Sequence, residues 1–268
     1  MESLMLAKPL VSVVCPTYRR PQHLPTAIRC FLQQTHPNKE LIIVDDGFEK
    51  APVIDDARII YMHLSDKTPT GTKRNLGAEY ASGEIIANWD DDDWSHPHRL
   101  EDQVQRLLRT GKAVTGYCAT VRFDEASRVL YTGSNCPPYF VSGTSQMYLK
   151  SWWELHPFPD VSQGEDSVFS RTARLEDQLA AASPGKMLIA RQHGGNTEVI
   201  NSARYKKLMP SDISEEFFKA VDAPVKNLAY TTEPHVCSHQ CQLDMIQQQH
   251  ADVGEGYRIT SWPEIQTR

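Results

Sequence analysis

The sequence lacks the features that mark membrane, secreted and zinc-ribbon proteins. No apolar run approaches the roughly 18 residues that a transmembrane helix requires, and residues 1–9 lack the charged and then apolar layout of a secretory signal. The six cysteines form no CxxC pair and no dense framework, so we expect reduced thiols in a cytoplasmic protein, with peripheral contact at the membrane left open. The formal net charge of −6 argues against a broadly basic nucleic-acid surface, although not against a local basic groove.

What the sequence does contain is enough material for one large α/β domain, since 40% of its 268 residues are hydrophobic. Residues 10–15 form a short, β-branched run typical of a buried strand, residues 24–32 carry apolar side chains at helical spacing, and residues 41–44 form a second buried run. A strand, a helix and a strand within about 35 residues make a βαβ unit, which implies parallel pairing. We therefore predict an α/β fold with a Rossmann-like, mostly parallel central sheet flanked by helices.

The same alternation of strands and helices continues along the chain. Further strands are predicted over residues 58–62, 84–88, 113–117, 120–123, 129–132 and 187–190, and further helices over residues 71–83 and 97–111. Ligands of parallel α/β sheets bind beyond the carboxyl ends of the strands. The segments after the first two strands, Pro16–Arg20 and Asp45–Gly47, are therefore expected to lie side by side at the binding edge.

Four consecutive carboxylates, Asp90 to Asp93, directly follow the predicted strand at residues 84–88. Two like charges about 4 Å apart repel by roughly 4 kcal/mol at an effective dielectric constant near 20. A solvated acidic turn would dilute this repulsion in water, whereas a divalent cation such as Mg²⁺, Mn²⁺ or Ca²⁺ would offset it through oxygen ligands. The position at the carboxyl end of a strand, between Trp89 and Trp94, favours the cation site.

Six motifs follow one another along residues 8–205. They are the segments 11–20, 40–47, 73–84, 90–101, 143–147 and 164–169. Together they resemble the family 2 glycosyltransferases of the GT-A fold, which are metal-dependent, inverting enzymes that use nucleotide-sugar donors. The resemblance implies a GT-A domain over residues 1–209, with a nucleotide-binding half over 8–95 and an acceptor half over 96–209. A C-terminal extension of unknown role would follow over residues 210–268.

The resemblance also assigns residues to the nucleotide-sugar donor. It implies that the donor-binding residues are Pro16, Tyr18, Arg19, Asp46, Lys73, Arg74, Asp90 and Asp91. Pro16 and Tyr18 would line the base and the ribose, and Asp46 would accept a hydrogen bond from the base N–H. Arg74, supported by Lys73, would contact the base or the phosphates. An ordinary strand-ending turn remains the alternative for Asp46, and a solvated first helical turn remains the alternative for Lys73.

The acid cluster takes the place of the family's Asp-x-Asp motif. The resemblance makes Asp90 and Asp92 its ends, although a shift by one residue to Asp91 and Asp93 stays open. The last Asp of the motif would bind Mn²⁺ or Mg²⁺, which bridges the two phosphates and stabilises the leaving diphosphate. His193 lies where several members of the family carry a late metal or diphosphate contact, and an ordinary structural histidine is the alternative.

An inverting transfer also needs a general base that deprotonates the acceptor hydroxyl. Gly164-Glu165-Asp166 matches the family's Glu-Asp motif at the start of a helix. The resemblance implies that Asp166 and Glu165 are the catalytic residues. Asp166 is the first choice for the base, and Glu165, the second choice, would contact the acceptor or the donor sugar. The alternative is that both side chains only stabilise the first helical turn, where carboxylates favour the helix dipole.

The resemblance ends near residue 210. Residues 213–221 fit one amphipathic helix. His235, Cys237, His239 and Cys241 suit zinc by their type, but their alternate spacing is unlike that of zinc fingers, so an ordinary loop is the main expectation. The extension would cover the acceptor cleft or mediate oligomerisation, and its sequence does not decide between the two.

The sequence therefore predicts a glycosyltransferase of the hexosyltransferase type that moves a sugar from a nucleoside diphosphate sugar, first of all a UDP-sugar, to an acceptor hydroxyl. The acceptor stays open among a glycan, a lipid-linked sugar, a protein, a small molecule and a nucleic acid, the last without any indication in its favour. A nucleotidyltransferase is one alternative, but its Gly-rich, Lys-containing phosphate loop after the first strand is missing. A non-catalytic module that binds nucleotide-sugars or carbohydrates is the other, and the intact acidic motifs argue against it.

Overall fold

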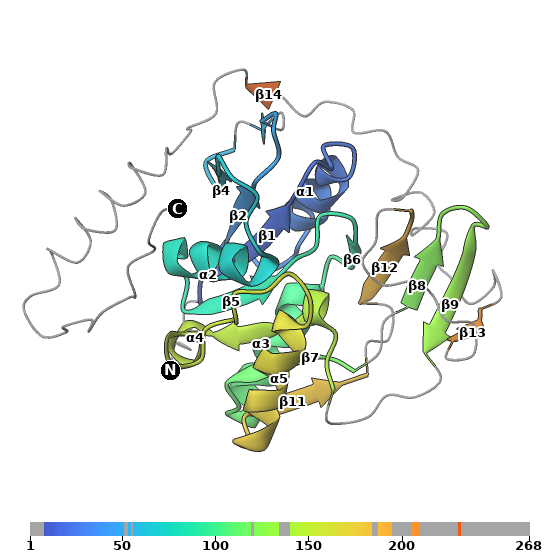
Figure 1. Cartoon of the computed structure of the whole chain (residues 1–268). Helices are drawn as coiled ribbons and strands as arrows, with labels where there is room; N and C mark the ends of the chain where they lie inside the picture. Colours follow the sequence, from blue (N-terminus) through green and yellow to red (C-terminus); the bar gives the residue numbers. More distant parts are fainter. Residues whose placement is uncertain are drawn as a thin grey trace, which may run out of the picture. The chain divides into compact units, whose positions relative to one another are not determined.

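A central sheet of seven strands organises the described part of the chain (Figure 1). Strand β10 runs antiparallel to both of its neighbours, and the other strands run parallel to one another. In spatial order the strands are β11 (Leu179–Ala182), β7 (Val114–Tyr117), β10 (Met147–Leu149), β5 (Ile85–Asn88), β1 (Val11–Thr17), β2 (Lys39–Asp45) and β4 (Ile59–His63). This arrangement confirms the predicted mostly parallel α/β fold.

The computed structural model describes residues 8–50, 53–54, 56–118, 121–133, 140–183, 187–194, 205–208 and 230–231. These residues all belong to one unit, Met1–Val236. The helix predicted over residues 213–221 and the histidines and cysteines of residues 235–241 lie outside the described residues. The domain boundary predicted at residue 209 stays a prediction.

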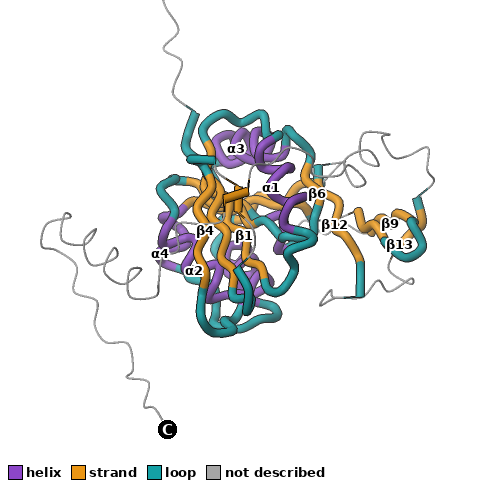
Figure 2. Tube along the Cα trace, turned by 90° about the horizontal axis from the view of Figure 1, so that it is seen from above, coloured by secondary structure: helices purple, strands orange, loops and turns teal. Residues whose placement is uncertain are grey.

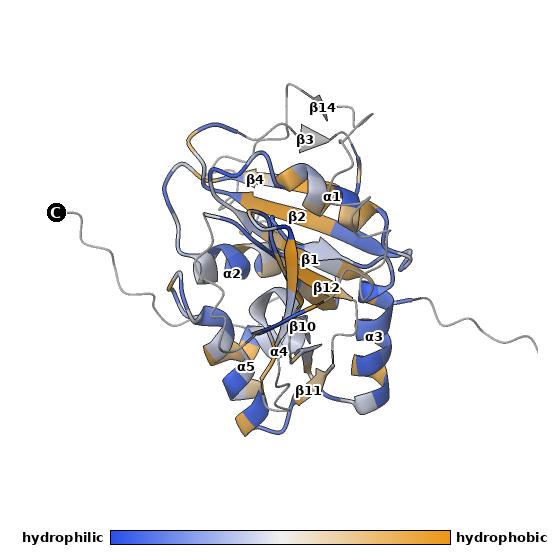
Figure 3. Ribbon diagram, turned by 90° about the vertical axis from the view of Figure 1, so that its right-hand side faces the viewer, coloured by the Kyte–Doolittle hydropathy of each residue, from blue (hydrophilic) through white to orange (hydrophobic). Residues whose placement is uncertain are grey.

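Helices cover both faces of the central sheet (Figure 3). Since successive side chains of a strand point to opposite faces, neighbouring residues of one strand pack against different helices. Val13 of β1 packs in one apolar cluster with residues of α1 and α3, whereas Val14 packs in another with residues of α2, α4 and α5. All buried side chains of β1 that contribute to these clusters are fully inaccessible to solvent. The helices are α1 (Leu24–Leu32), α2 (Thr70–Tyr80), α3 (Arg99–Thr110), α4 (Lys150–Leu155) and α5 (Glu165–Leu175), with a short 3₁₀ turn η1 (Gly143–Ser145).

Parallel pairing brings three strand ends to one edge of the sheet. Strand β1 lies between β2 and β5 and pairs with both in parallel, with Thr17 opposite Asp45 and Val14 opposite Asn88. The loops that follow β1, β2 and β5 therefore leave from the same edge. This is the edge at which the sequence predicts the binding site.

A second, smaller sheet lies beside the central one (Figure 2). Its β6 directly follows the acid cluster and pairs antiparallel with β12, with Trp94 opposite Ile189. This pairing carries the chain after β12 back toward the acid cluster. The strands in spatial order are β13 (Tyr205–Lys207), β9 (Val129–Gly133), β8 (Val121–Asp124), β12 (Leu188–Gln192) and β6 (Trp94–Ser95), and a separate pair is formed by β3 (Val53–Ile54) and β14 (Tyr230–Thr231).

Two expectations about helices and cysteines can be compared with the structure directly. The helix predicted from residue 97 begins at Arg99 and ends before Gly111, whose φ of 65° is the left-handed conformation common after helices. Cys15 and Cys30 are free and buried, as expected, but Cys118 is disulfide-bonded, so the expectation of reduced thiols is wrong there. Sequence spacing alone does not reveal which cysteines pair. None of the helices in the described part of the chain has the length and hydropathy needed to span a membrane.

Candidate active site

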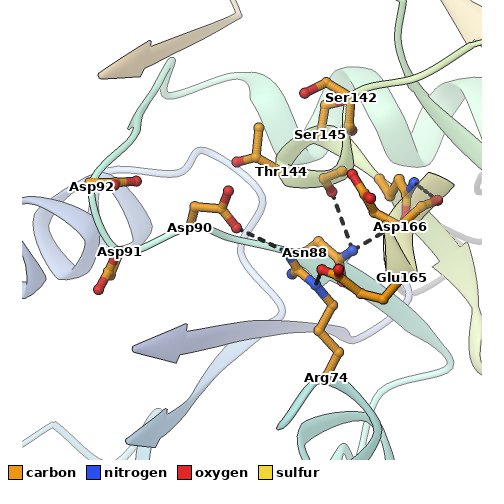
Figure 4. A network of polar contacts seen from close by, with 12 residues as sticks. Arg74, Asn88, Asp90, Asp91, Asp92, Ser142, Thr144, Ser145, Glu165 and Asp166 are labelled. Carbon is orange, nitrogen blue, oxygen red and sulfur yellow. Dashed lines mark hydrogen bonds and ion pairs between the residues drawn. The ribbon is translucent and has the colours of Figure 1, made fainter. Parts of the chain in front are cut away.

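The acid cluster follows β5 at the binding edge of the sheet. Asp90, Asp92 and Asp93 each offer a carboxylate oxygen, and these oxygens lie within 4.8 Å of one another. Asp91 points away from this group (Figure 4). Its Oδ2 accepts a hydrogen bond of 2.6 Å from the Thr17 hydroxyl. The predicted pair of Asp90 and Asp92 thus belongs to one group of carboxylates, which Asp93 joins.

Burial makes this group of carboxylates unfavourable when it is fully charged. Burial and the charges of Asp91 and Asp90 raise the pKa of Asp92 to about 7. Burial also raises the pKa of Asp93 and the pKa of Asp91. A hard divalent cation prefers oxygen ligands and would relieve this repulsion. The donor set therefore fits Mg²⁺ or Mn²⁺.

Two cationic or ionisable side chains reach the cluster from other elements. Arg20, in the loop after β1, donates from Nη1 to Asp91 Oδ1 at 3.1 Å and to Asp92 Oδ2 at 2.7 Å. His193, just after β12, places Nε2 3.0 Å from the same Asp92 oxygen. The ring of His23 stacks on His193 with a centroid distance of 4.5 Å. The predicted residue His193 therefore lies at the acid cluster.

Arg20 and His23 are contacts that the sequence analysis did not single out. The predicted residue Arg19 is exposed, has a φ of 54°, and places its guanidinium 4.0 Å from the ring centroid of Phe48. This left-handed backbone turns the two adjacent arginines in different directions. The only signal for Arg20 was its place in a motif that contains two arginines in a row.

A second set of predicted residues gathers at the ends of β1 and β2. Lys73 is buried and donates to Asp46 Oδ1 at 2.6 Å and to the Thr17 carbonyl at 2.9 Å. The Thr68 backbone N–H donates to Asp46 Oδ2 at 2.7 Å. The half-buried Tyr18 ring lies 5.9 Å from Lys73 Nζ. Lys73 is therefore not part of a solvated helical turn.

Pro16 and Asp45 flank this second set without joining its ion pair. Pro16 lies on β1, opposite Val44 of β2, and is half-buried. The Asp45 carboxylate accepts hydrogen bonds from the Gly47 backbone N–H at 2.8 Å and from the Tyr61 hydroxyl at 2.6 Å. Asp45 thus closes the turn after β2, while Asp46 faces Lys73.

Arg74 links the acid cluster to helix α5. Its buried guanidinium donates from Nη2 to Asp90 Oδ1 at 3.1 Å and from Nε to Glu165 Oε1 at 3.4 Å (Figure 4). Burial raises the pKa of Glu165, although the charge of Arg74 opposes this effect. The structure places Lys73, and not Arg74, beside Asp46.

Asp166 is held close to the turn η1. A Cβ atom on Gly143 would clash with the Asp166 carboxylate, so glycine permits this approach. The Gln146 side chain donates to the Asp166 carbonyl at 2.8 Å, and Asn88 at the end of β5 donates to the Gly143 carbonyl at 3.2 Å. These contacts tie β5, η1 and α5 together around Asp166 (Figure 4). Gly164, with a φ of 81°, occupies the N-cap of α5 in place of an acidic residue.

We expect the metal-free protein to lose about 1 kcal/mol of stability, or about 2–4 °C in Tm, between about pH 6.5 and pH 8. Folded Asp92 keeps its proton up to about pH 7, whereas an unfolded Asp releases it near pH 4, so deprotonation disfavours the folded state. The raised pKa values of Asp91 and Asp93 act in the same direction. The lowered pKa values of His23 and His193 oppose the trend only below about pH 6.5, where unfolded histidine is charged.

Thermal denaturation at several pH values, in chelator and in Mn²⁺, checks this expectation. Bound Mn²⁺ should flatten the decline because the cation replaces the proton. A metal-free Tm that is constant or rises over this pH range would contradict it.

Comparison with known proteins identifies sequence relatives. A sequence model described as glycosyl transferase family 2 matches residues 12–159, which is more than half of the chain. The putative teichuronic acid biosynthesis glycosyltransferase TuaG of Bacillus subtilis is 32% identical over 41% of this chain and 47% of its own length. The putative colanic acid biosynthesis glycosyl transferase WcaA of Escherichia coli is 37% identical over 36% of this chain and 37% of its own length. The chain thus spans less than half of the length of these curated relatives.

Solved structures show the same fold at low sequence identity. TarS of Staphylococcus aureus in complex with UDP-GlcNAc aligns with a TM-score of 0.56 and 17% identity over 71% of this chain and 62% of its own. The mannosyltransferase PcManGT of Pyrobaculum calidifontis in complex with GDP-Man and Mn²⁺ aligns with a TM-score of 0.53 and 16% identity, over 69% of this chain and 57% of its own. The sheet with its one antiparallel strand and these alignments confirm the predicted GT-A fold.

Proposed function

Because the chain belongs to glycosyl transferase family 2, we propose that it transfers a sugar from a nucleoside diphosphate sugar to an acceptor hydroxyl, with inversion at the anomeric carbon. One observation carries the proposal. The carboxylates of Asp90, Asp92 and Asp93 lie together, and Arg74 joins Asp90 to Glu165, the neighbour of Asp166. A diphosphate-binding group and a general base are the two parts that such a transfer requires.

The acid cluster would hold the divalent cation through carboxylate oxygens of Asp90, Asp92 and Asp93, with the His193 ring beside Asp92. When bound, Mn²⁺ or Mg²⁺ would act as a Lewis acid that neutralises the diphosphate as it leaves the sugar. The buried position of Asp92 and Asp93 keeps water from screening that charge.

Asp166 would take the proton from the acceptor hydroxyl, so that the hydroxyl oxygen attacks the anomeric carbon on the side opposite the leaving diphosphate. This geometry inverts the configuration of that carbon. The Ser167 N–H donates to the Asp166 carboxylate at 2.7 Å, and Gln146 fixes the Asp166 backbone carbonyl at 2.8 Å, which favours proton transfer in a fixed direction. Glu165, paired with Arg74, would contact the acceptor or the donor sugar.

Asp46 and Lys73 present a hydrogen-bond acceptor beside a donor. Uracil, thymine and guanine carry the complementary N–H beside a carbonyl group, whereas adenine and cytosine do not. Tyr18 would stack against the base, and Pro16 would line the ribose. We propose UDP-sugars as the first donor class. The similar structures of TarS and PcManGT are complexes with UDP-GlcNAc and GDP-Man, which are donors with such bases.

UDP and GDP should bind in Mn²⁺ at least about tenfold more tightly than CDP and ADP, because a base without the imide N–H cannot donate a hydrogen bond to Asp46. Isothermal titration with the four diphosphates measures this preference. Replacing Asp46 by Asn should reduce the preference, and replacing the surface residue Asp177 by Asn should preserve it. CDP binding as tight as UDP binding would contradict the base assignment.

We propose a hydroxyl of a glycan as the acceptor, because the names of TuaG and WcaA refer to the biosynthesis of teichuronic and colanic acid. Incubation with a panel of UDP-sugars and glycan acceptors in Mn²⁺, followed by mass spectrometry, tests the transfer. Failure of every UDP-sugar and GDP-sugar to be turned over would refute the proposed function.

A further inference from the structure

Arg20 is a cation inside the acid cluster that the transfer step described above does not use. Arg20 lies in the loop after β1 and contacts both Asp91 and Asp92 through Nη1. Its side chain is 28% exposed, whereas those of Asp91 and Asp92 are 4% and 5% exposed. The guanidinium therefore lies at the boundary between the buried carboxylates and solvent.

Arg20 and a divalent cation would compete for the same carboxylate. Asp92 Oδ2 accepts the 2.7 Å hydrogen bond from Arg20, and Asp92 is also one of the grouped carboxylates suited to a cation. A divalent cation on Asp92 would stand close to the guanidinium charge and repel it. The two positive groups therefore favour different states of the cluster.

We propose that Arg20 is a mobile counter-cation, which pairs with Asp92 in the metal-free protein and moves to the donor's diphosphate when a divalent cation takes that carboxylate. The inference rests on the proposed function, since it requires a nucleoside diphosphate at the acid cluster. It makes Arg20 a contact of the leaving group. Its charge would add to that of the cation as the bond to the sugar breaks.

The position of Arg20 fits this exchange. Phosphate oxygens bound to a cation lie about 2 Å from it, and Arg20 already contacts a carboxylate of that site. Tyr18, the proposed base contact, lies two residues before Arg20 in the same loop. A guanidinium also binds phosphate oxygens in a planar, two-pronged manner. The diphosphate would therefore lie within reach of the Arg20 side chain.

Two other arginines near the cluster each also pair with a glutamate outside it. Arg74 is buried and bridges Asp90 and Glu165. Arg191 pairs with Glu125 at 2.8 Å, and its backbone N–H donates to Asp93. Arg20 contacts two carboxylates of the acid cluster, Asp91 and Asp92, through one nitrogen atom.

Substituting glutamine for Arg20 should change two affinities in opposite directions. Without nucleotide, Arg20→Gln should bind Mn²⁺ about tenfold more tightly, because the competing charge is gone. In saturating Mn²⁺, the same variant should bind UDP about tenfold more weakly, because a phosphate contact is lost. Titration calorimetry, or the electron paramagnetic resonance signal of free Mn²⁺, measures the first affinity, and calorimetry measures the second.

Two variants serve as comparisons. Arg58→Gln removes the same charge from an arginine that pairs with Asp56 at 2.6 Å, away from the cluster, and should change neither affinity. Arg20→Lys keeps the charge but loses the planar guanidinium, so its Mn²⁺ affinity should stay near that of the wild type. Its UDP affinity should lie between those of the wild type and Arg20→Gln. If Arg20→Gln weakens both affinities, or changes neither, the counter-cation role is overturned.

A measurement on the unaltered protein covers the case in which Arg20→Gln does not fold. Phenylglyoxal modifies accessible arginines, and peptide mass spectrometry locates the modified residue. Mn²⁺ alone should increase modification of Arg20, and further addition of UDP should protect it. Unchanged or reduced reactivity in Mn²⁺ would overturn the inference, whereas failure of the wild-type protein to bind Mn²⁺ or UDP would refute the proposed function itself.

Discussion

Replacing Asp166 by Asn should lower kcat by about 10²–10⁴-fold, the usual contribution of a general base, while UDP binding in Mn²⁺ stays within about twofold of wild type. Asparagine has nearly the same shape, so it fits against Gly143 and can still accept the 2.7 Å hydrogen bond from the Ser167 N–H. It cannot take a proton from the acceptor. Steady-state kinetics of sugar transfer and calorimetry with UDP separate the two effects.

A parallel variant of Glu165 tests which of the two neighbouring carboxylates is the base. Glu165→Gln keeps a side chain that can still accept from Arg74, so we expect a smaller loss of kcat than for Asp166→Asn. Asp177→Asn, just after the same helix α5, should leave kcat unchanged. Full transfer by Asp166→Asn with loss of transfer in Glu165→Gln would reverse the assignment.

Replacing Asp92 by Asn should abolish the metal-dependent part of UDP binding and, at the same time, stabilise the metal-free protein at pH 8. The raised pKa of Asp92 means that its ionised form disfavours the folded state, and asparagine resembles the neutral form. A carboxyl group that titrates near pH 7 in the folded state and near pH 4 in the unfolded state disfavours folding by about 4 kcal/mol at pH 8, so we expect a gain of that order, or roughly 10 °C in Tm. Thermal shift with chelator and with Mn²⁺ plus UDP measures both effects in one series.

Asp91→Asn is the matched control for this prediction. Asp91 is adjacent in sequence and also buried, but its carboxylate contacts Thr17 and Arg20 and is not one of the grouped oxygens. The Asp91→Asn variant should keep most of the Tm rise that Mn²⁺ and UDP cause in the wild type. A complete loss of that rise in Asp91→Asn, with a normal rise in Asp92→Asn, would show that the metal-binding register is shifted by one residue.

Arg74 gives the two halves of the proposed mechanism a common element. Its guanidinium contacts Asp90 on one side and Glu165 on the other, and its burial leaves little freedom to exchange partners. The carboxylates that would hold the cation and the start of helix α5 are therefore positioned together. Metal binding and acceptor activation would then be aligned before the donor arrives, which is how preorganised sites lower a barrier.

The sequence by itself determined the elements and the edge of the sheet that they share. Buried strands at residues 10–15, 41–44 and 84–88 were readable because short apolar runs end at turn residues, and parallel order followed from the helices between them. The chemistry of the site was readable because carboxylates stand together at Asp90–Asp93 and at Glu165-Asp166. Such local patterns need no knowledge of distant contacts.

Only the tertiary structure decided which neighbouring side chain faces which partner. The left-handed backbone of Arg19 leaves Arg20 at the acid cluster, and Lys73 rather than Arg74 meets Asp46. Pairing of β6 with β12 carries His193 to Asp92, 101 residues away in sequence. The physical reason is the same in each case. A side chain's direction depends on backbone dihedrals and on packing between strands far apart in the chain, which local sequence patterns do not encode.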